Sequence, residues 1–255
     1  MISELEVIQR HLKRDYELEL QIGIDGKVEH DECVDHCLPY AFGVCKQIHN
    51  KRCVNCCNFH EFFEKLQNSL GSDHYEFLEN CQQRLYYYLA HQTRKVYLNA
   101  QLKANLLELD NEGALLIVDY KMRILPKTAR ETKAEFFGKR GWTLHSVLLY
   151  TKNEAENNLN ITAFDHWSLD TKQDAWFTAS SLHAVFNTMS NKPKWITIFS
   201  DNGPHYHNSE MMVIMTRWKE WYNITVKKWI FLEAGEAKTA IDSHHAQVKS
   251  NFFIL

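Results

Sequence analysis

The stretch Ala114-Leu115-Leu116-Ile117-Val118-Asp119-Tyr120 decides the fold of this 255-residue chain. Its unbroken apolar run, rich in Leu, Ile and Val, predicts a central strand of a sheet. An aspartate at the end of such a strand is costly to bury unless it is paired or bound to a metal ion. Asp119 is therefore the first candidate functional residue of the chain.

Downstream of this strand, strand-like and helical segments follow in a definite order. Strands are predicted over residues 142–150, 160–167, 195–199 and 225–232, and helices over 174–189, 208–221 and 237–249. Ser200-Asp201-Asn202-Gly203-Pro204 is a turn signal directly after the fourth strand. The order β-β-β-α-β-α-β-α predicts an α/β (mixed α+β) domain, in which a mixed five-stranded sheet is flanked by helices.

Three aspartates stand out in this order. Asp119 ends the first strand, Asp201 follows the fourth, and Asp242 lies in the last helix. Groups at the ends of adjacent strands converge on one edge of a sheet, and carboxylates gathered there need a divalent cation. Oxygen ligands suit Mg²⁺ or Mn²⁺, and two such ions about 4 Å apart support phosphoryl transfer.

Each of the later two aspartates also has a plainer explanation. Asp201 could simply form its turn. Asp242 lies four residues after Lys238, so an ordinary helical ion pair is an alternative. Glu233 and Glu236 are rival third acids, although Glu236 and Asp242 are about 240° apart around a helix and cannot face the same ions.

The element order, with these three acids, resembles the ribonuclease-H-like fold of DDE/DDD transposases and integrases over residues 114–250. Four motifs are similar to transposon-derived proteins of eukaryotes: Val118-Asp119-Tyr120-Lys121-Met122, Phe136-Phe137-Gly138-Lys139-Arg140-Gly141, Ser200-Asp201-Asn202-Gly203 and Ile241-Asp242-Ser243-His244-His245. The resemblance implies metal-dependent DNA cleavage and joining in the nucleus by Asp119, Asp201 and Asp242. Well-known transposases carry Glu at the third position, so Asp242 departs from them.

A second feature is a cluster of cysteines upstream of this domain. Six of the seven cysteines fall within 25 residues, and His36, His49 and His60 lie within this segment or just after it. Soft ligands at this density favour zinc over buried thiols or disulfides in a chain without a signal peptide. The resemblance also implies a zinc module at this place. The candidate ligands are Cys33, Cys37, Cys45, His49, Cys53 and Cys56, whereas Cys57 and His60 look dispensable. One ion with four ligands and two ions with eight both remain open.

A basic strip follows the first strand, although the chain as a whole has a formal charge of −3. Residues 121–140 carry seven basic side chains against two acidic ones. A solvated face explains such a strip, but the resemblance favours a DNA-facing role for Arg130, Lys139 and Arg140, with salt-sensitive affinity. His205, His207, His244 and His245 lie near the acids without an assigned role. The tryptophans Trp142, Trp176, Trp195 and Trp229 have core-like spacing.

The sequence predicts three regions. Residues 1–62 form a zinc module with a helical lead-in and a short strand at 18–24, residues 63–112 a connector containing a long helix at 73–108, and residues 113–255 the nuclease-like domain. No apolar run is long enough for a membrane span, and the first residues lack a signal-peptide core.

The leading hypothesis is a transposase-like enzyme that uses Mg²⁺ or Mn²⁺ on DNA, with a homo-oligomer left open. The alternative is a domesticated or truncated transposon remnant, a zinc-containing module that binds nucleic acid or protein without catalysis. The 13 residues after Asp242 and the lack of a clear helix-turn-helix favour this alternative.

Overall fold

The structure is a computed structural model that describes residues 2–125, 130, 132–138, 141–153, 158–233 and 239–252. The chain forms two compact units, Met1–Ala104 and Asn105–Leu255. The division falls inside the long helix α5, Tyr75–Leu107, so this helix is shared between the units.

The C-terminal unit is built on a five-stranded sheet with the strand order β3-β2-β1-β4-β5. The strands are β1 Gly113–Ile124, β2 Trp142–Asn153, β3 Asn158–Ser168, β4 Trp195–Asp201 and β5 Thr225–Leu232. The pairs β1–β2 and β2–β3 are antiparallel, whereas β1–β4 and β4–β5 are parallel. This is the ribonuclease-H-like arrangement, and the predicted fold class is confirmed.

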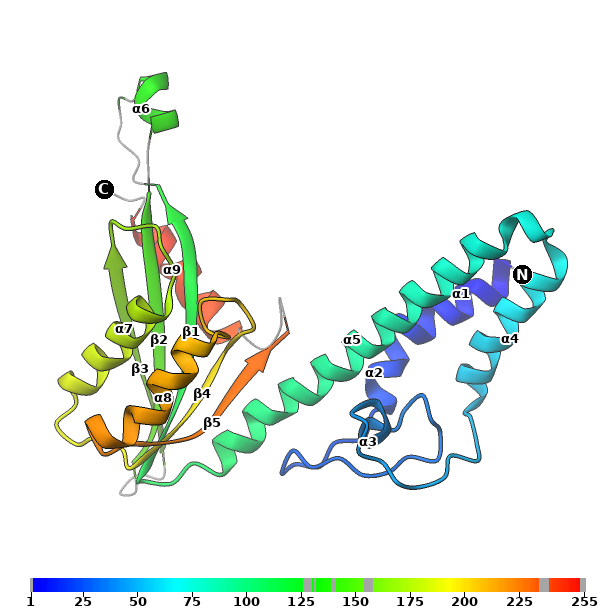
Figure 1. Ribbon diagram of the computed structural model, residues 1–255, viewed down its shortest axis with the longest axis horizontal. Coiled ribbons are helices and arrows are strands. Elements are labelled where there is room, and N and C mark those ends of the chain that lie inside the picture. The colour runs from blue at the N-terminus through cyan, green and yellow to red at the C-terminus, as the bar shows by residue number, and fades with distance from the viewer. Residues whose placement is uncertain are drawn as a thin grey trace. The chain divides into compact units, whose positions relative to one another are not determined.

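Helices cover both faces of this sheet (Figure 1). They are α7 Ala175–Thr188 and α8 Ser209–Tyr222 on one face and α9 Thr239–Phe252 on the other, with the short α6 Lys133–Gly138 beyond β1. Side-chain caps fix where α7 and α8 begin: Asp174 accepts from Phe177 N at 2.8 Å, and Asn208 from Met211 N at 2.8 Å.

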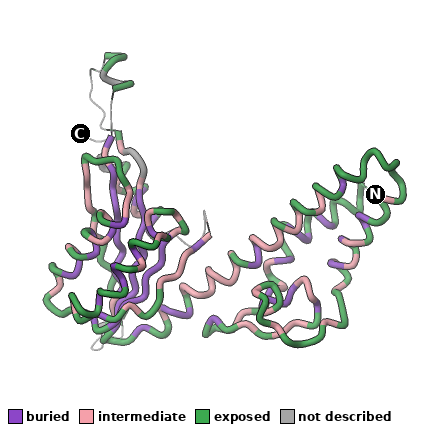
Figure 2. Tube along the Cα trace, in the orientation of Figure 1, coloured by how far each residue is buried: buried purple, intermediate pink, exposed green. Residues whose placement is uncertain are grey.

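The alternation of side chains along β1 places Asp119 on the face that α9 covers. Leu116 and Val118 pack into the core beneath α7 and α8. Leu115 and Ile117 point to the opposite face, yet they are buried as well, because α9 packs against β1 and β2. Figure 2 shows the resulting purple band of buried residues through the middle strands. Asp119 follows in the same alternation, so its carboxylate lies under α9.

β1 begins with a glycine because the neighbouring strand leaves no room for a side chain. Gly113 pairs with Trp195 of β4, and a Cβ at residue 113 would collide with the Trp195 indole ring. Trp195 is buried, and Trp142 and Trp229 are partly buried, in line with the expected core positions. The expectation for Trp176 is wrong: it is 62% exposed, on the outer side of α7.

The N-terminal unit is helical in its regular elements. Besides α5, they are α1 Ile2–Arg10, the π-helical turn His11–Asp15, α2 Tyr16–Glu19, α3 Leu38–Ala41, α4 Val54–Ser69 and the 3₁₀ turn Ser72–His74. The predicted strand at 18–24 is wrong. Of its alternating apolar residues, Leu18 lies inside α2, and Leu20 follows this helix and packs with Tyr16 and Leu38. Ile22 makes only an isolated bridge to Val28.

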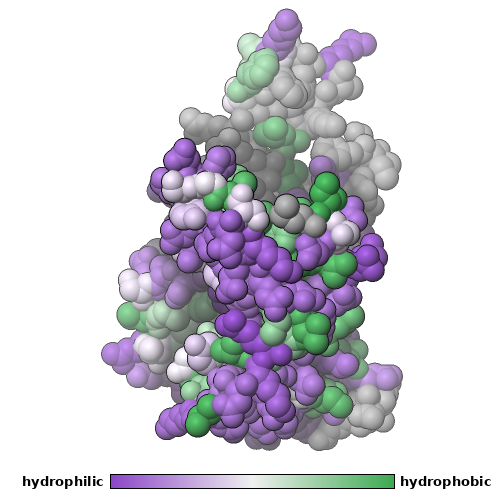
Figure 3. Space-filling view, turned by 90° about the vertical axis from the view of Figure 1, so that its right-hand side faces the viewer, coloured by the Kyte–Doolittle hydropathy of each residue, from purple (hydrophilic) through white to green (hydrophobic). Residues whose placement is uncertain are grey.

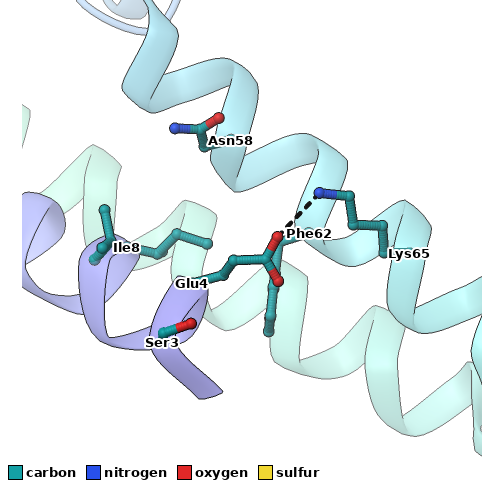
Figure 4. A pocket seen from close by; sticks show the side chains of 7 residues that line it. Ser3, Glu4, Ile8, Asn58, Phe62 and Lys65 are labelled. Carbon is teal, nitrogen blue, oxygen red and sulfur yellow. Dashed lines mark hydrogen bonds and ion pairs between the residues drawn. The ribbon is translucent and has the colours of Figure 1, made fainter. Parts of the chain in front are cut away.

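The core of this unit is aromatic. Ile8 and Leu12 pack against Phe59, Phe62 and Phe63 of α4, and several residues of α5 complete the cluster. Figure 4 shows α1 beside α4, with Lys65 Nζ donating to Glu4 Oε1 at 3.1 Å. The predicted connector helix thus supplies core side chains to the N-terminal unit.

One face of the molecule is mostly polar. Figure 3 shows a face covered by hydrophilic side chains, with hydrophobic ones in small separate groups. In the described part of the chain, no helix combines the length and hydropathy that crossing a bilayer requires.

Candidate functional site

Asp119 and Asp201 lie at matching positions in the register of the neighbouring parallel strands β1 and β4. The β1–β4 register pairs Ile117 with Phe199, and Asp119 and Asp201 each lie two residues further along. Residues two apart on a strand share a face, so both aspartates point to the side of the sheet that α9 covers.

Helix α9 brings a second acid to this point. Asp119, Asp242 and His245 each offer a ligand atom, and these atoms all lie within 4.8 Å of one another. Asp242 and His245 are three residues apart, so they share one face of the helix. Asp119 is only 8% exposed, and its Oδ2 lies 3.7 Å from His245 Nδ1. The sequence-predicted pair Asp119 and Asp242 is therefore brought together.

His245 is held in its neutral form by its surroundings. It is 1% exposed, and burial lowers its pKa to about 4, with smaller effects from the charges of Lys121 and His244. Neither ring nitrogen has a hydrogen-bond partner among the described residues. A neutral imidazole with an unoccupied nitrogen can coordinate a metal ion. The two carboxylates suit Mg²⁺ or Mn²⁺, and a transition-metal ion such as Mn²⁺ also accepts the imidazole.

Asp201 is directed toward its own turn. Its Oδ1 accepts a hydrogen bond from Gly203 N at 2.8 Å and lies 3.3 Å from His205 Nε2. The group of ligand atoms around Asp119 does not include Asp201 among the described residues. The turn-forming role considered for Asp201 is thus present, next to the site that Asp119 and Asp242 share.

A buried tyrosine lies close to both strand-end acids. Tyr206 follows the turn of Asp201 and is fully buried, and its pKa is raised well above 10 by burial, with added effects from the charges of Asp119 and Asp201. Its hydroxyl lies 3.0 Å from His145 Nε2. Tyr206 and His145 therefore form a buried, uncharged pair on the α7–α8 side of the sheet.

A fourth acid, Asp165, lies in register with Asp119 across the sheet, and the sequence patterns did not single it out. Asp119 pairs with Ser146 of β2, and Ser146 pairs with Asp165 of β3. The Ser146 hydroxyl donates to Asp165 Oδ1 at 2.5 Å. His244 Nε2 of α9 lies 2.9 Å from the same oxygen and 3.0 Å from Asp165 Oδ2. The sequence did hold a signal for Asp165, because this acid lies inside a predicted strand (160–167), as Asp119 does.

The remaining predicted site residues are less informative. His207 is exposed and bonds to Asn202 Oδ1 at 2.6 Å. Arg130 is exposed. Lys139 and Arg140, with Glu236 and Lys238, lie outside the described residues.

The Cys/His segment of the N-terminal unit forms two groups with possible metal ligands. One contains His30, Cys37, Cys45 and His49, and the other contains Cys33, His36, Cys53 and Cys56, with all ligand atoms of a group within 4.8 Å of one another. The six predicted candidates are all included, divided between the groups, and Cys57 and His60 belong to neither. His30 was missed because it precedes the cysteine cluster.

Comparisons with known proteins give one family. The family described as "Domain of unknown function (DUF8701)" matches residues 94–253, more than half of the chain. No curated protein matches the chain. A structure described as "Crystal structure of the Mos1 Strand Transfer Complex" is similar at 12% identity, covering 86% of this chain and 84% of that one, with a TM-score of 0.33. Because that TM-score is low, the fold assignment rests on the strand order and directions of the sheet.

Proposed function

This chain belongs to the DUF8701 family of unknown function, and we propose that its C-terminal unit cleaves and joins DNA phosphodiester bonds with the help of divalent metal ions. The observation that carries the proposal is the convergence of Asp119, from the central strand, with Asp242 and His245, from α9. In a ribonuclease-H-like sheet this is the place where strand ends and the last helix meet.

Three residues would hold Mg²⁺ or Mn²⁺. Asp119 and Asp242 supply carboxylate oxygens, His245 supplies a neutral ring nitrogen, and Asp201 adds negative charge at the end of the adjacent strand. Bound there, such ions would activate a water or a 3′-hydroxyl and stabilise the leaving oxygen of an in-line displacement.

The chain's own residues prepare this site. Burial keeps His245 uncharged at neutral pH, so it does not compete with a metal ion for the two carboxylates. His205 lies against Asp201 and is placed to hold that carboxylate or to exchange a proton with it. Gly203 N, by donating to Asp201, fixes the side chain at the strand end.

The substrate is proposed to be DNA on the basis of charge. Lys121 is close enough to the site to lower the pKa of His245, and Arg130 and Lys133 are exposed beyond the same strand. Cationic side chains in this position would contact phosphates, so binding should weaken as salt rises. Lys139 and Arg140 belong to the same proposed DNA-facing strip, and the resemblance to transposases implies action in the nucleus.

Plasmid nicking tests the proposal. The purified chain is incubated with supercoiled plasmid and Mg²⁺ or Mn²⁺, and nicked circles are measured over time. Asp119→Asn and Asp242→Asn should each lower the rate at least about 100-fold, because each removes a charge that the ions require. Asp170→Asn, in an exposed loop, is the matched control and should cut like the parent.

The non-catalytic alternative has one structural observation in its favour, the bonding of Asp201 to its own turn. Salt-sensitive DNA binding without any metal-dependent nicking would support it. Equal cutting by the parent and by Asp119→Asn would show that a nicking activity does not come from this site.

A further inference from the structure

We propose that the N-terminal unit binds two zinc ions in separate sites that share no ligand. The first site consists of His30, Cys37, Cys45 and His49, and the second of Cys33, His36, Cys53 and Cys56. The proposal concerns the N-terminal unit alone and stands independently of DNA cleavage.

The distances within the first site match those of a zinc tetrahedron. Zinc–sulfur bonds of about 2.3 Å and zinc–nitrogen bonds of about 2.0 Å at tetrahedral angles place sulfur about 3.6 Å from nitrogen. His30 Nδ1 lies 3.3 Å from Cys45 Sγ and 3.7 Å from Cys37 Sγ, and His49 Nε2 lies 4.0 Å from Cys45 Sγ. The four groups are thus arranged around a common centre.

The second site joins a turn to the start of a helix. Cys33 and His36 lie in a tight turn, in which His36 N donates to Cys33 O at 3.1 Å. Cys53 caps α4, and Cys56 lies in its first turn. His36 Nε2 is 3.6 Å from Cys56 Sγ, the sulfur–nitrogen separation expected around zinc.

Backbone donors in the second site are aimed at sulfur. Cys53 N donates to Cys33 Sγ at 3.4 Å, and Cys56 N donates to Cys53 Sγ at 3.3 Å. Hydrogen bonds of this kind stabilise thiolates and fix their direction. Cys33 and Cys56 are buried, so a shared cation is what would allow several thiolates to be accommodated here.

Disulfide pairing and simple burial both account for the cluster less well than zinc does. None of the seven cysteines forms a disulfide, and pairing cysteines would leave the converging histidines of the two groups without a role. Burial of thiols as small apolar groups fails for Cys45 and Cys53, which are only half-buried.

His36 has a competing set of neighbours. Its Nε2 lies 3.0 Å from Glu19 Oε2, and His11, Glu19 and His36 could also form a three-ligand group. Three thiolates bind zinc more strongly than one carboxylate and a histidine, because zinc prefers sulfur and nitrogen ligands. We therefore assign His36 to the cysteines, and a His11 variant tests that choice.

The chain order of the ligands links the two sites. His36 and Cys37 are adjacent in the sequence, yet they belong to different sites. Cys33 and His36 of the second site both lie between His30 and Cys37 of the first site. Loss of one ion should therefore make the other easier to extract with a chelator.

The test is the metal content of the full-length protein by elemental analysis and native mass spectrometry. Two zinc ions per chain are expected in the parent. His30→Ala and His36→Ala should each retain one, while the controls Cys57→Ser, His60→Gln and His11→Gln retain two. Parent protein with one ion or none would overturn the proposal, as would two ions retained in either alanine variant. Loss of an ion from His11→Gln would overturn the assignment of His36.

A rescue variant guards against simple misfolding. His30→Cys keeps four ligands in the first site and should again hold two ions. In protein loaded with Co²⁺, it should show more sulfur-to-metal charge-transfer absorption than the parent, because a third thiolate joins that ion. If His30→Ala loses both ions, restoration of two by His30→Cys supports the proposal, and failure to restore them counts against it.

Discussion

The hydroxyl of Ser146 donates a 2.5 Å hydrogen bond to Asp165 Oδ1, across the β2–β3 pair. This contact connects the edge strand to the position directly beside Asp119, because Ser146 is also the register partner of Asp119. Asp165 in turn contacts His244 of α9. The helix that carries Asp242 is thereby tied to the sheet through side chains beside the proposed metal site.

Asp165→Asn should reduce metal-dependent nicking about tenfold, which is the usual scale for residues that orient metal ligands. An amide is a weaker acceptor for Ser146 and His244, so α9 would hold Asp242 less firmly. The measurement is the nicking rate over a range of Mg²⁺ concentrations. A positioning role predicts that more Mg²⁺ is needed for half-maximal rate, whereas Asp170→Asn stays unchanged.

His245→Gln should raise the Mg²⁺ or Mn²⁺ concentration needed for half-maximal nicking by at least about tenfold, because it removes a nitrogen ligand. His245 lies 3.7 Å from Asp119, so Mn²⁺ binding measured without DNA should weaken in parallel. His183→Gln, an exposed histidine on α7, is the control. Unchanged metal dependence would remove His245 from the site.

Much of the C-terminal fold could be predicted because its signals are local. The apolar run before Asp119 and the turn around Asp201 placed two strands, and the ribonuclease-H-like fold followed from the resemblance. Asp165 was missed because its importance depends on register with Ser146, which one strand alone does not reveal. The strand expected at 18–24 failed for a related reason: burial of Leu20 against Tyr16 and Leu38 outweighed the local alternation.

The N-terminal ligands show the same limit. Cys53 and Cys56 could be paired from spacing, and they do share a group. Cys33 and Cys37 have equally suggestive spacing, but they fall in different groups. Which site each ligand joins is decided by tertiary contacts that spacing does not encode.

Leu116→Ala should destabilise the C-terminal unit by about 2–5 kcal/mol, because it opens a cavity in a fully packed core. Leu116 is 0% exposed in the central strand and packs beneath α7 and α8. Leu159→Ala, on the exposed part of β3, should change stability by less than about 0.5 kcal/mol. Urea denaturation followed by tryptophan fluorescence measures both, and equal effects would show that β1 is not the packed centre.

Stability of the C-terminal unit should fall as the solution is acidified, in part because of His145. Burial lowers the pKa of His145 well below its usual 6.5, and nearby histidines add to the shift. Below about pH 6.5 the unfolded chain therefore binds a proton that the folded chain excludes, so stability decreases as pH falls and is regained as pH rises. One such proton changes the slope by at most about 1.4 kcal/mol per pH unit.

His145→Gln should flatten this dependence between pH 5 and pH 6.5, since the amide does not titrate. Some slope should remain, because burial also lowers the pKa of His166. The measurement is the denaturation midpoint of parent and variant at each pH, taken as a difference so that any acid sensitivity of the N-terminal cysteine sites cancels. The denaturation midpoint of the control variant His183→Gln should change with pH as that of the parent does. If the midpoint of His145→Gln also has the same pH dependence as the parent, His145 does not stay neutral in the folded protein.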